Sequence, residues 1–469
     1  MWRAFCKLGQ IFAVLLLPVV LLSWWEQELV WQWYACLWLG MVLMFVFLEQ
    51  VLPDSIMSLR DSFLLLPVSW VGLSVVATLP FYVGQPMLWI DAWFAAVSGI
   101  TTTGAEVFPD LGLLPKSLLF YRMWLQFLGG LGIVVLAMAW SSIAKNHAGM
   151  MLRTDLPGPV KTHSFAPKIG EAAHSLWTIY VTLYLLCAGL CYQFGMSAFE
   201  ALCESMAIVS TGGFGLYNDN LAHYASTPIY GVVIASMLLG SVNYILHYQY
   251  VVTHQLSTYY HNKEFCLYMG IVCMLLVVSH GVSYLSGDGL TFLDRTFMIV
   301  SLVSTAGHQV VAMTSIVPAV ALLLTFFCML GGCSGSTAGG IKMLRLRFFT
   351  RDFTNALAQL IHPQAVFASY LDTPSSSQSD FVLVRGFLLA YLIVLSFGWW
   401  CLVALGLDIV QAFSMVVACL SNTGLPVLGD MSHYAQLSVA AKFLLTLLML
   451  FGRVELMGFF LLIGLRRAR

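Results

Sequence analysis

The sequence predicts an all-α polytopic membrane protein, with four units of helix, pore loop and helix around one pore and two further transmembrane helices in front. Two observations support this prediction. Ten apolar segments are each long enough to cross a bilayer core of about 30 Å, which takes roughly 20 helical residues. Four shorter segments between them match one another position by position, which indicates an internal repeat.

The composition agrees with this fold class. Of the 469 residues, 60% are hydrophobic and 9% are charged, whereas a soluble domain carries roughly 25% charged residues. A water-soluble globule is therefore excluded. The formal net charge of -1 argues against a nucleic-acid partner, because such a partner requires a strongly basic face.

The predicted spanning segments follow the chain from its first residues. The first segment has the basic start of a signal peptide but no small-residue cleavage site, so we expect it to remain as a transmembrane helix. The ten segments are 8–25, 33–52, 62–83, 115–144, 172–195, 227–258, 264–285, 317–350, 381–405 and 436–465.

The four repeated segments are too short to span, and each ends in a cluster of Gly, Thr and Ser. This length is typical of a re-entrant half-helix. Each segment begins with Asp, Glu or Gln, which favour a helix N-terminus, and has a hydroxyl three positions before its final glycine. The segments are Asp91 to Gly104, Glu200 to Gly213, Asp294 to Gly307 and Gln411 to Gly424, and the hydroxyls belong to Thr101, Ser210, Ser304 and Ser421.

These units divide the chain into five parts. Two extra helices are expected in residues 1–60, and the four pore repeats in 61–150, 151–262, 263–375 and 376–469. The distribution of charge orients them. With the N-terminus in the cytoplasm, all but five of the 21 Lys and Arg residues lie on the cytoplasmic side, as the positive-inside rule requires.

The outer side is predicted to be acidic around the four turns. Four basic residues fall there, namely Lys116, Arg122, Arg295 and Lys442, and Arg453 falls within a span. The carboxylates on the same side include Asp91, Glu106, Asp110, Glu200, Glu204, Asp219, Asp288, Asp294, Asp408 and Asp430. We therefore expect an outer mouth that concentrates cations.

Four equivalent polar turns predict a ring around one axis, because a polar turn at membrane depth is tolerated only inside protein or beside water. Backbone carbonyls in such a ring can replace the hydration shell of a monovalent cation. The final glycines permit backbone φ values that most residues avoid, and the negative C-terminal ends of the half-helices favour cations. The alternative is that these glycines only allow close helix packing, which explains neither the hydroxyls nor the short helices.

A second motif, GGCSGSTAGGIK, occupies residues 331–342 and interrupts the eighth spanning segment. It is not a phosphate-binding P-loop, because Ile341 separates Gly340 from Lys342 and Met343 replaces the Ser or Thr that would follow the lysine. Its small residues disfavour a straight helix. We expect an intramembrane loop that obstructs or clears the pore, with a passive kink as the alternative.

Two single residues have two possible roles each. A charge at the depth of Arg453 is costly unless it faces protein or water, so it either forms a cationic barrier in the pore or pairs structurally with Glu455 or a carbonyl. His308 directly follows the third glycine. It is either a pH-sensitive residue at the lip of the ring or a structural side chain behind it.

No nucleophile with a paired base, no metal-ligand cluster and no phosphate cradle occurs in the sequence, so we do not expect an enzyme. Two further functions stay open. A proton- or sodium-coupled secondary symporter would also contain broken helices, although its repeats are normally inverted or paired halves. A membrane receptor or scaffold would have no need of four matched turns.

The sequence resembles the Trk/Ktr/HKT superfamily of potassium transporters, specifically its bacterial TrkH branch, in the motifs TTTGA, STGGFG, STAGH, SNTGL, QFLGGLGIVVLAMA, RTDLPGPVK, GGCSGSTAGGIK and GRVE. The resemblance implies potassium uptake across the bacterial inner membrane through a pore in each subunit of a homodimer. It also implies a cytosolic regulatory subunit of the TrkA type, which binds NAD(H) and adenine nucleotides. K+ is then the transported ion, and this chain itself is expected to bind no cofactor.

The family's functional positions fall on matching residues of this chain. The selectivity filter falls on Thr102, Thr103, Gly104, Thr211, Gly212, Gly213, Thr305, Ala306, Gly307, Asn422, Thr423 and Gly424. The gate falls on Gly331, Gly332, Cys333, Ser334, Gly335, Ser336, Thr337, Ala338, Gly339, Gly340 and Lys342, with Arg453 as the pore arginine. Glycine at position 104 matches the potassium-preferring pattern of the family. The chain departs from the family at His308 and at Leu425 and Pro426.

Overall fold

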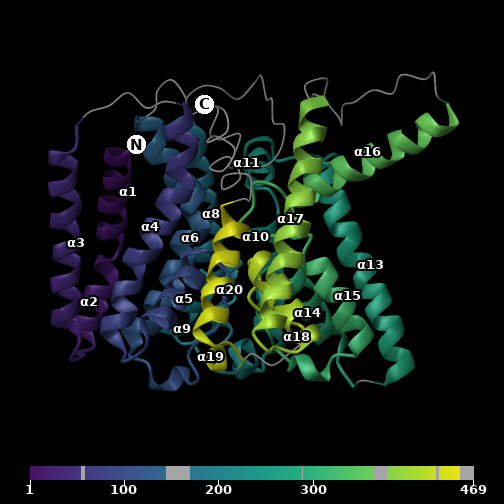
Figure 1. Cartoon of the computed structure of the whole chain (residues 1–469). Helices are drawn as coiled ribbons and strands as arrows, with labels where there is room; N and C mark the ends of the chain where they lie inside the picture. Colours follow the sequence, from purple (N-terminus) through teal and green to yellow (C-terminus); the bar gives the residue numbers. More distant parts are fainter. Residues whose placement is uncertain (54–58, 144–168, 288, 363–377, 429–432, 455–469) are drawn as a thin grey trace.

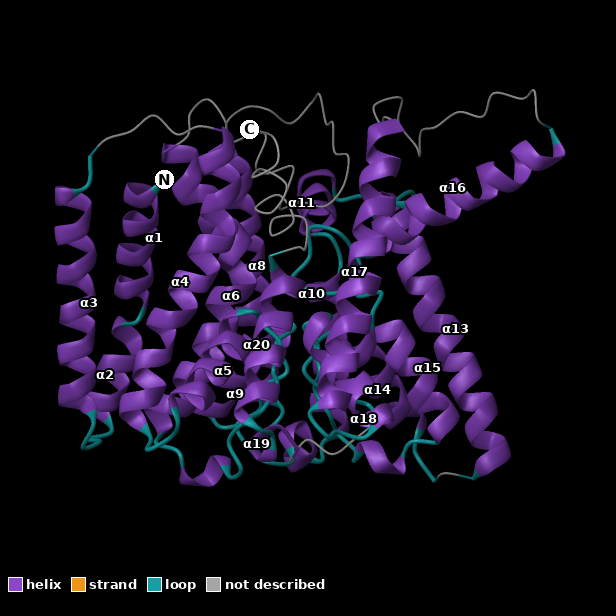
Figure 2. Cartoon of the chain, in the orientation of Figure 1, coloured by secondary structure: helices purple, strands orange, loops and turns teal. Residues whose placement is uncertain are grey.

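The fold is built from helices throughout the part of the chain that is described. The computed structural model describes residues 1–53, 59–143, 169–287, 289–362, 378–428 and 433–454, and every regular element in these ranges is an α- or 3-10 helix (Figures 1 and 2). The predicted all-α class is confirmed. The motif RTDLPGPVK at 153–161, Asp288, Asp430 and Glu455 lie outside the described residues.

Two helical rods precede the repeats along one side of the molecule (Figure 1). The first rod is α1 (Trp2–Leu15) continued by α2 (Leu17–Trp25), and the second is α3 (Trp31–Val51), which packs against α1. The packing is close at Gly9, where a Cβ atom would lie under 3.0 Å from the ring of Phe45. These rods match the first two predicted spanning segments.

Four units follow, each with a long helix, a short half-helix and a second helix that is long or broken. The first unit holds α4 (Leu59–Gly84), α5 (Trp89–Ile100) and α6 (Lys116–Ile143), and the second holds α8 (Ile169–Gln193), α9 (Ala198–Val209), α10 (Thr227–Ser241) and α11 (Tyr244–Thr253). The third holds α13 (Lys263–Ser286), α14 (Phe292–Val303), α15 (Pro318–Cys328) and α16 (Met343–Ile361), and the fourth holds α17 (Gln378–Ala404), α18 (Ile409–Leu420) and α20 (Val439–Arg453). Short helices in the connections are η1 (Leu111–Leu113), η2 (Asn220–Tyr224), α12 (Ser257–Tyr260), η3 (Met313–Ser315) and α19 (His433–Gln436).

The half-helices α5, α9, α14 and α18 each contain 12 residues and all lie in the lower half of Figure 1. The acidic or amide residue that opens each predicted segment is the third residue of its helix. In α9 this residue completes a capping box, since Ser197 and Glu200 each accept a hydrogen bond from the other's backbone N–H. Thr291 and Asp294 form the same box in α14. Such boxes satisfy the free N–H groups of a helix start, which fixes where these two half-helices begin.

Two predicted spans are broken in the structure. The prediction of one continuous helix over 227–258 is wrong, because the chain bends by 98° between α10 and α11. Within 317–350, α15 ends at Cys328, the 331–342 loop follows, and α16 continues to Ile361 away from the bundle (Figure 1). A break at membrane depth frees backbone groups that need other partners, and these two breaks supply partners to each other.

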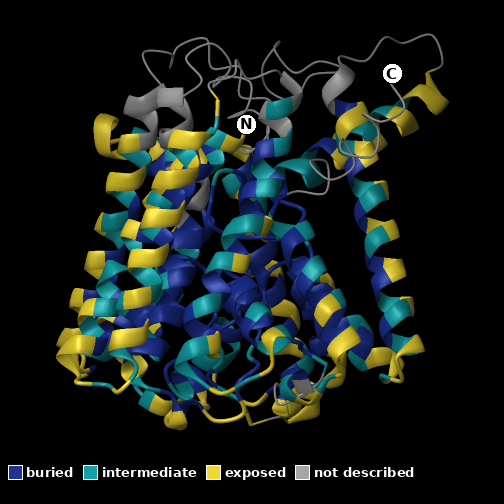
Figure 3. Cartoon of the chain, turned by 60° about the vertical axis from the view of Figure 1, so that its left-hand side comes forward, coloured by how far each residue is buried: buried dark blue, intermediate teal, exposed yellow. Residues whose placement is uncertain are grey.

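The described helices have the surface of a membrane protein. Six of them are long and apolar enough to cross a membrane, or seven if α10 and α11 count as one span. Buried residues fill the centre of the bundle and exposed residues lie on its outer helices (Figure 3). Many of the exposed side chains are apolar, such as Val277, Leu285 and Phe397. Large apolar exposure of this kind is expected where lipid surrounds a protein.

In three of the units, a glycine lets the second helix pack directly on the C-terminal end of the half-helix of the same unit. A Cβ atom at Gly129, Gly240 or Gly452 would lie under 3.0 Å from a carbonyl oxygen at the end of a half-helix, at Ile100, Val209 and Leu420 respectively. Glycine is therefore required by space at these three positions. The sequence analysis assigned them no role, although they follow their half-helices at similar distances along the chain.

We expect Gly129→Ala to lower the free energy of unfolding by about 1–3 kcal/mol, because its Cβ would overpack α6 against α5. Thermal unfolding of the purified protein in detergent measures the change. The matched control is Gly189→Ala in α8, where no atom lies within 4 Å of the new Cβ, and it should unfold with the wild-type Tm. An unchanged Tm for Gly129→Ala would contradict the packing account.

Candidate functional site

Each half-helix ends in a four-residue turn with the same backbone pattern. We call residues 101–104 the first turn, 210–213 the second, 304–307 the third and 421–424 the fourth. The second residue of each turn has left-handed φ, namely Thr102 (51°), Thr211 (52°), Thr305 (57°) and Asn422 (55°). The last residue of each is a glycine with φ of 78°, 84°, 75° and 65° in turn order. Left-handed φ strains a residue that has a side chain, and such strain concentrates at functional sites.

The turns are tied back to their own half-helices. In each turn the N–H of the third residue donates to the carbonyl five residues earlier. These bonds are Thr103 to Ser98 (2.9 Å), Gly212 to Ala207 (2.7 Å), Ala306 to Ser301 (2.8 Å) and Thr423 to Ala418 (2.9 Å). The predicted hydroxyls also bond backwards, as Thr101 Oγ1 does to Val97 O at 2.6 Å. They therefore satisfy carbonyls at the half-helix C-terminus.

The four turns contact one another in a closed ring. A Cβ atom on the last glycine of each turn would lie under 3.0 Å from a carbonyl oxygen of the next turn. The pairs are Gly104 with Gly212 O, Gly213 with Ala306 O, Gly307 with Thr423 O, and Gly424 with Thr103 O. The contacts run from the first turn through the second, third and fourth and back to the first. Both φ and space therefore require glycine at these four positions.

The 331–342 loop lies against three of the turns. Thr337 Oγ1 is 3.2 Å from Thr211 Oγ1 in the second turn, and Gly339 N donates to Thr305 Oγ1 in the third at 2.7 Å. A Cβ on Gly339 would lie under 3.0 Å from Ser421 O in the fourth. A predicted gate residue thus touches the ring at each of these points.

The loop is not helical, yet much of its backbone is hydrogen-bonded. It pairs with the break between α10 and α11, where Cys333 N donates to Ser241 O (2.9 Å) and Tyr244 N donates to Gly335 O (3.1 Å). Ser334 N donates to the buried carboxylate of Glu264, at 2.6 Å from Oε1. These partners allow an irregular segment to persist inside the membrane region.

Arg453 connects three repeats at the level of the loop. Its Nη1 donates to Thr337 O at 2.9 Å and its Nη2 donates to Gly129 O at 2.8 Å. The guanidinium lies 5.9 Å from the ring centre of Trp70. Of the structural partners predicted for Arg453, carbonyls are present, and Glu455 is outside the described residues. One of those carbonyls belongs to the loop, so Arg453 holds the loop against α6.

Two of the predicted outer basic residues are buried and paired. Arg122 is fully buried and forms an ion pair with Glu106, and Lys442 Nζ bonds Asp91 Oδ1 at 2.6 Å. These pairs add no net charge to the outer mouth. Charges taken out of water need such partners, because an unpaired buried charge is strongly destabilising.

The remaining outer carboxylates differ in exposure. Glu204 is buried and accepts a hydrogen bond from Leu216 N at 2.8 Å, so it adds no exposed charge to the outer face. Asp110 is exposed. Its hydrogen bonds from Asn218 Nδ2 and Gly112 N hold the pKa of this carboxyl below its usual range. Asp110 therefore stays ionised at the outer face.

Side chains link the second turn to the third and the fourth turn to the first, and a cysteine of α15 contacts the fourth turn. Asn220 Nδ2 donates to Gly213 O at 3.0 Å and its Oδ1 lies 3.2 Å from His308 Nδ1, joining the second and third turns. Cys328 Sγ of α15 lies 3.0 Å from Thr423 Oγ1. Asn422 Nδ2 donates to Thr103 Oγ1 at 3.0 Å, joining the fourth and first. His308 is fully buried, and its contact with Asn220 fits the structural role expected as one of its two alternatives.

Gln126, Asn220 and Glu264 are site residues that the sequence patterns did not single out. The available signal was a single polar residue inside an apolar run, as at Gln126 in MWLQFLGG, but such a signal does not tell which partner the side chain meets. No group of three or more His, Cys, Asp or Glu residues in the described ranges is placed to hold a metal ion. What the site offers a ligand is therefore backbone and hydroxyl oxygen.

A comparison with known families decides what kind of protein this is. The sequence profile of TrkH, described as a cation transport protein, matches residues 27–464. The chain belongs to the TrkH family. The matched residues include all four turns, the 331–342 loop and Arg453. The chain is accordingly a multi-pass membrane protein of the inner membrane.

Individual TrkH relatives are similar over most of their length. The Trk system potassium uptake protein TrkH of Escherichia coli (strain K12) is 34% identical over 405 residues, covering 84% of this chain and 83% of that protein. The protein of the same name from Vibrio parahaemolyticus is 34% identical over 415 residues, covering 86% and 85%. The crystal structure of the potassium transporter TrkH from Vibrio parahaemolyticus matches with a TM-score of 0.88 at 28% identity, over 98% of each chain.

We expect Arg453→Gln to loosen the loop, because the shorter side chain cannot reach Thr337 O and Gly129 O together. Cys333 in the loop is 1% exposed, so its reaction with a small thiol reagent reports opening. The reaction should accelerate about tenfold on loss of these bonds, as measured by mass spectrometry of the labelled peptide.

Two controls accompany this measurement. Arg385→Gln removes an equal charge from an exposed ion pair with Asp352 and should leave the Cys333 rate unchanged. Cys203, buried in α9, should react at the same rate in the wild-type protein and in both variants. A wild-type rate for Cys333 in Arg453→Gln would show that Arg453 does not hold the loop.

Proposed function

We propose that this chain carries potassium ions into the cell across the bacterial inner membrane, along the axis enclosed by the four turns. The observation that carries the proposal is the closed ring of glycine contacts from the first turn back to the first. The TrkH relatives named as potassium uptake proteins support the choice of ion. The proposal assigns the selectivity filter to residues 102–104, 211–213, 305–307 and 422–424.

The geometry favours a partly dehydrated cation. The C-terminal end of each half-helix carries partial negative charge, and all four half-helices end at the ring. The turns present backbone carbonyls, and the backbone of each turn is held because the N–H of its third residue donates to a carbonyl of its own half-helix. Oxygen dipoles held in this way can replace water around a monovalent ion. An anion would meet the wrong sign of charge at every turn.

The 331–342 loop is proposed as the gate. It touches three of the four turns and is held by Arg453 and Glu264, so it obstructs the path on the cytoplasmic side of the ring. Its last residue, Lys342, directly precedes α16, which leaves the bundle (Figure 1). A force on α16 would therefore reach the loop without an intervening linker.

The proposed partners fit this arrangement. A homodimer is supported by the exposed apolar side chains Phe349, Phe353 and Leu357 on α16, which a second copy would cover. A cytosolic TrkA-type subunit that binds NAD(H) or adenine nucleotides would act from the cytoplasmic side, where α16 leaves the bundle, and move α16. We propose no enzymatic activity and no cofactor for this chain, and we place its pore repeats at 61–150, 151–262, 263–375 and 376–469.

The direct test is transport. Purified full-length protein in lipid vesicles should take up K+ along its electrical gradient, and the gene should restore growth on low potassium to an uptake-deficient bacterium. Uptake that also requires an inward proton or sodium gradient would favour the coupled symporter. No flux of any ion, with a regulatory subunit present, would instead favour a receptor or scaffold.

We expect Gly104→Ser to weaken discrimination between K+ and Na+ by about tenfold or more, because the new side chain must displace Gly212 O or alter the φ of 78°. Vesicle fluxes of the two ions measure the ratio. Gly270→Ser in α13, where no atom lies within 4 Å, is the control and should keep the wild-type ratio. An unchanged ratio in Gly104→Ser would rule out the assignment of the filter.

Deletion of Gly335 and Ser336 shortens the loop and removes the carbonyl that accepts from Tyr244 N. The basal K+ flux should rise, because the shortened loop can no longer reach the turns while Cys333 N stays bonded to Ser241 O. We expect an increase of about tenfold, the size expected when about 1.4 kcal/mol of closure is lost. Flux is measured without a regulatory subunit on protein that elutes as a single folded species. Wild-type flux from such a species would contradict the gate assignment.

A further inference from the structure

Helix α6 places two polar side chains behind the junction of the first and second turns. Arg122 and Gln126 are both fully buried and are four residues apart, so they lie one above the other on one face of the helix. Neither belongs to the filter or the gate proposed above. Burying uncompensated polar groups costs free energy, so their partners decide what they are for.

Gln126 holds the second turn from both sides of Gly213. Its Nε2 donates to Gly212 O at 2.6 Å, and its Oε1 accepts from Phe214 N at 3.3 Å. The approach leaves no space for a side chain at position 212, where a Cβ would lie under 3.0 Å from the Gln126 amide. Gly212 O is the oxygen that Gly104 of the first turn faces. Gln126 thus fixes the direction of the carbonyl that joins the two turns.

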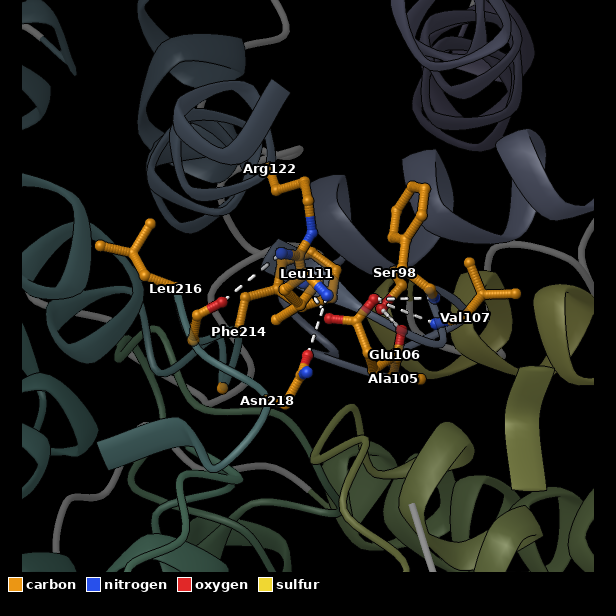
Figure 4. Close-up of polar contacts among 12 residues, drawn as sticks. Ser98, Ala105, Glu106, Val107, Leu111, Arg122, Phe214, Leu216 and Asn218 are labelled. Atoms are coloured by element: carbon orange, nitrogen blue, oxygen red, sulfur yellow. Dashed lines mark hydrogen bonds and ion pairs between the residues drawn. The ribbon is translucent and has the colours of Figure 1, made fainter. Parts of the chain in front are cut away.

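Arg122 lies four residues before Gln126 on α6 and contacts the segments that follow the first and second turns (Figure 4). It forms an ion pair with Glu106, two residues after Gly104 of the first turn. Its guanidinium also lies 4.4 Å from the ring centre of Phe214, which directly follows the second turn, and its Nη1 is 3.4 Å from Gly215 O. Glu106 in turn accepts hydrogen bonds from Val107 N and Phe108 N at 3.1 Å. The segments that follow both turns are therefore bound to one arginine.

Equivalent positions in other repeats show that helix packing alone does not need these polar groups. Gln126 lies three residues before Gly129, the glycine that packs on the end of α5. The residues three before Gly240 and Gly452 are Met237 and Met449, and the residues seven before, in the register of Arg122, are Val233 and Leu445. All four are apolar and buried. Of the three repeats with this packing glycine, only the first carries the polar pair.

We infer that Arg122 and Gln126 are positioning residues that fix the spacing of the first and second turns and thereby set the preference for K+ over Na+. The inference rests on the proposed function. A carbonyl restrained by the Gln126 amide cannot move inward to contact a smaller ion, whereas a released carbonyl can. Glu106 supports the pair by orienting and neutralising the guanidinium.

The test uses Gln126→Met in the full-length protein, because methionine is the residue that α10 and α20 carry in this register. The K+ to Na+ flux ratio in vesicles should fall about tenfold or more, because both hydrogen bonds of the buried Gln126 amide are lost, with K+ flux near the wild-type value. The double variant Arg122→Met with Glu106→Gln, which removes both charges of the ion pair, should lower the ratio similarly. Met237→Leu at the same register should keep it.

The outcomes separate this inference from the proposed function. A wild-type ratio in folded Gln126→Met protein, or equal losses of K+ and Na+ flux, would overturn the positioning role. A wild-type protein without K+ selectivity, or no effect of Gly104→Ser, would overturn the proposed function instead. A lowered ratio in both Gln126→Met and the double variant, together with a normal ratio in Met237→Leu, would support the inference.

Discussion

The structure depends on one contact made four times, the approach of a turn glycine to a carbonyl oxygen of the next turn. The contact is possible only without a side chain, and it fixes how close the four half-helices come. Their equal length of 12 residues and the close approach of Gly129, Gly240 and Gly452 to their C-terminal ends follow from the same requirement. If the turns separated, carbonyls inside a membrane would lose their arrangement around the axis, and no other part of the fold could restore it.

Irregular backbone inside a membrane needs partners, and here two irregular segments supply each other. The bend between α10 and α11 frees groups at Ser241 and Tyr244, and the 331–342 loop bonds to both. The loop therefore remains stable without being a helix. A few hydrogen bonds keep the loop in place, including one donated by Arg453 and one accepted by Glu264. The loop can therefore move without unfolding the helices around it. That combination is what a gate requires.

The sequence predicted the features that recur. Four matched segments, their glycines and the interrupting GGCSGSTAGGIK motif are visible as patterns, because each follows from a backbone requirement that restricts residue type. It did not predict the 98° bend after Ser241, since the apolar run continues through it. Nor did it predict that Arg122 meets Glu106 or that Asn220 reaches Gly213. Those contacts join residues 16 and 7 positions apart in loops and helices whose mutual orientation only the folded chain determines.

The turns are held by different side chains, with an arginine and a glutamine behind the first and second, an asparagine between the second and third, a cysteine of α15 against the fourth and another asparagine between the fourth and first. In a channel made of four identical subunits, one substitution changes the surroundings of the ion at four equivalent places. In a single chain whose four turns are held by different side chains, a substitution changes the surroundings of one turn and leaves those of the other three turns unchanged. Selection can therefore adjust ion preference in small, separate steps, and natural variants of this fold should differ in graded fashion more often than by abrupt loss of discrimination.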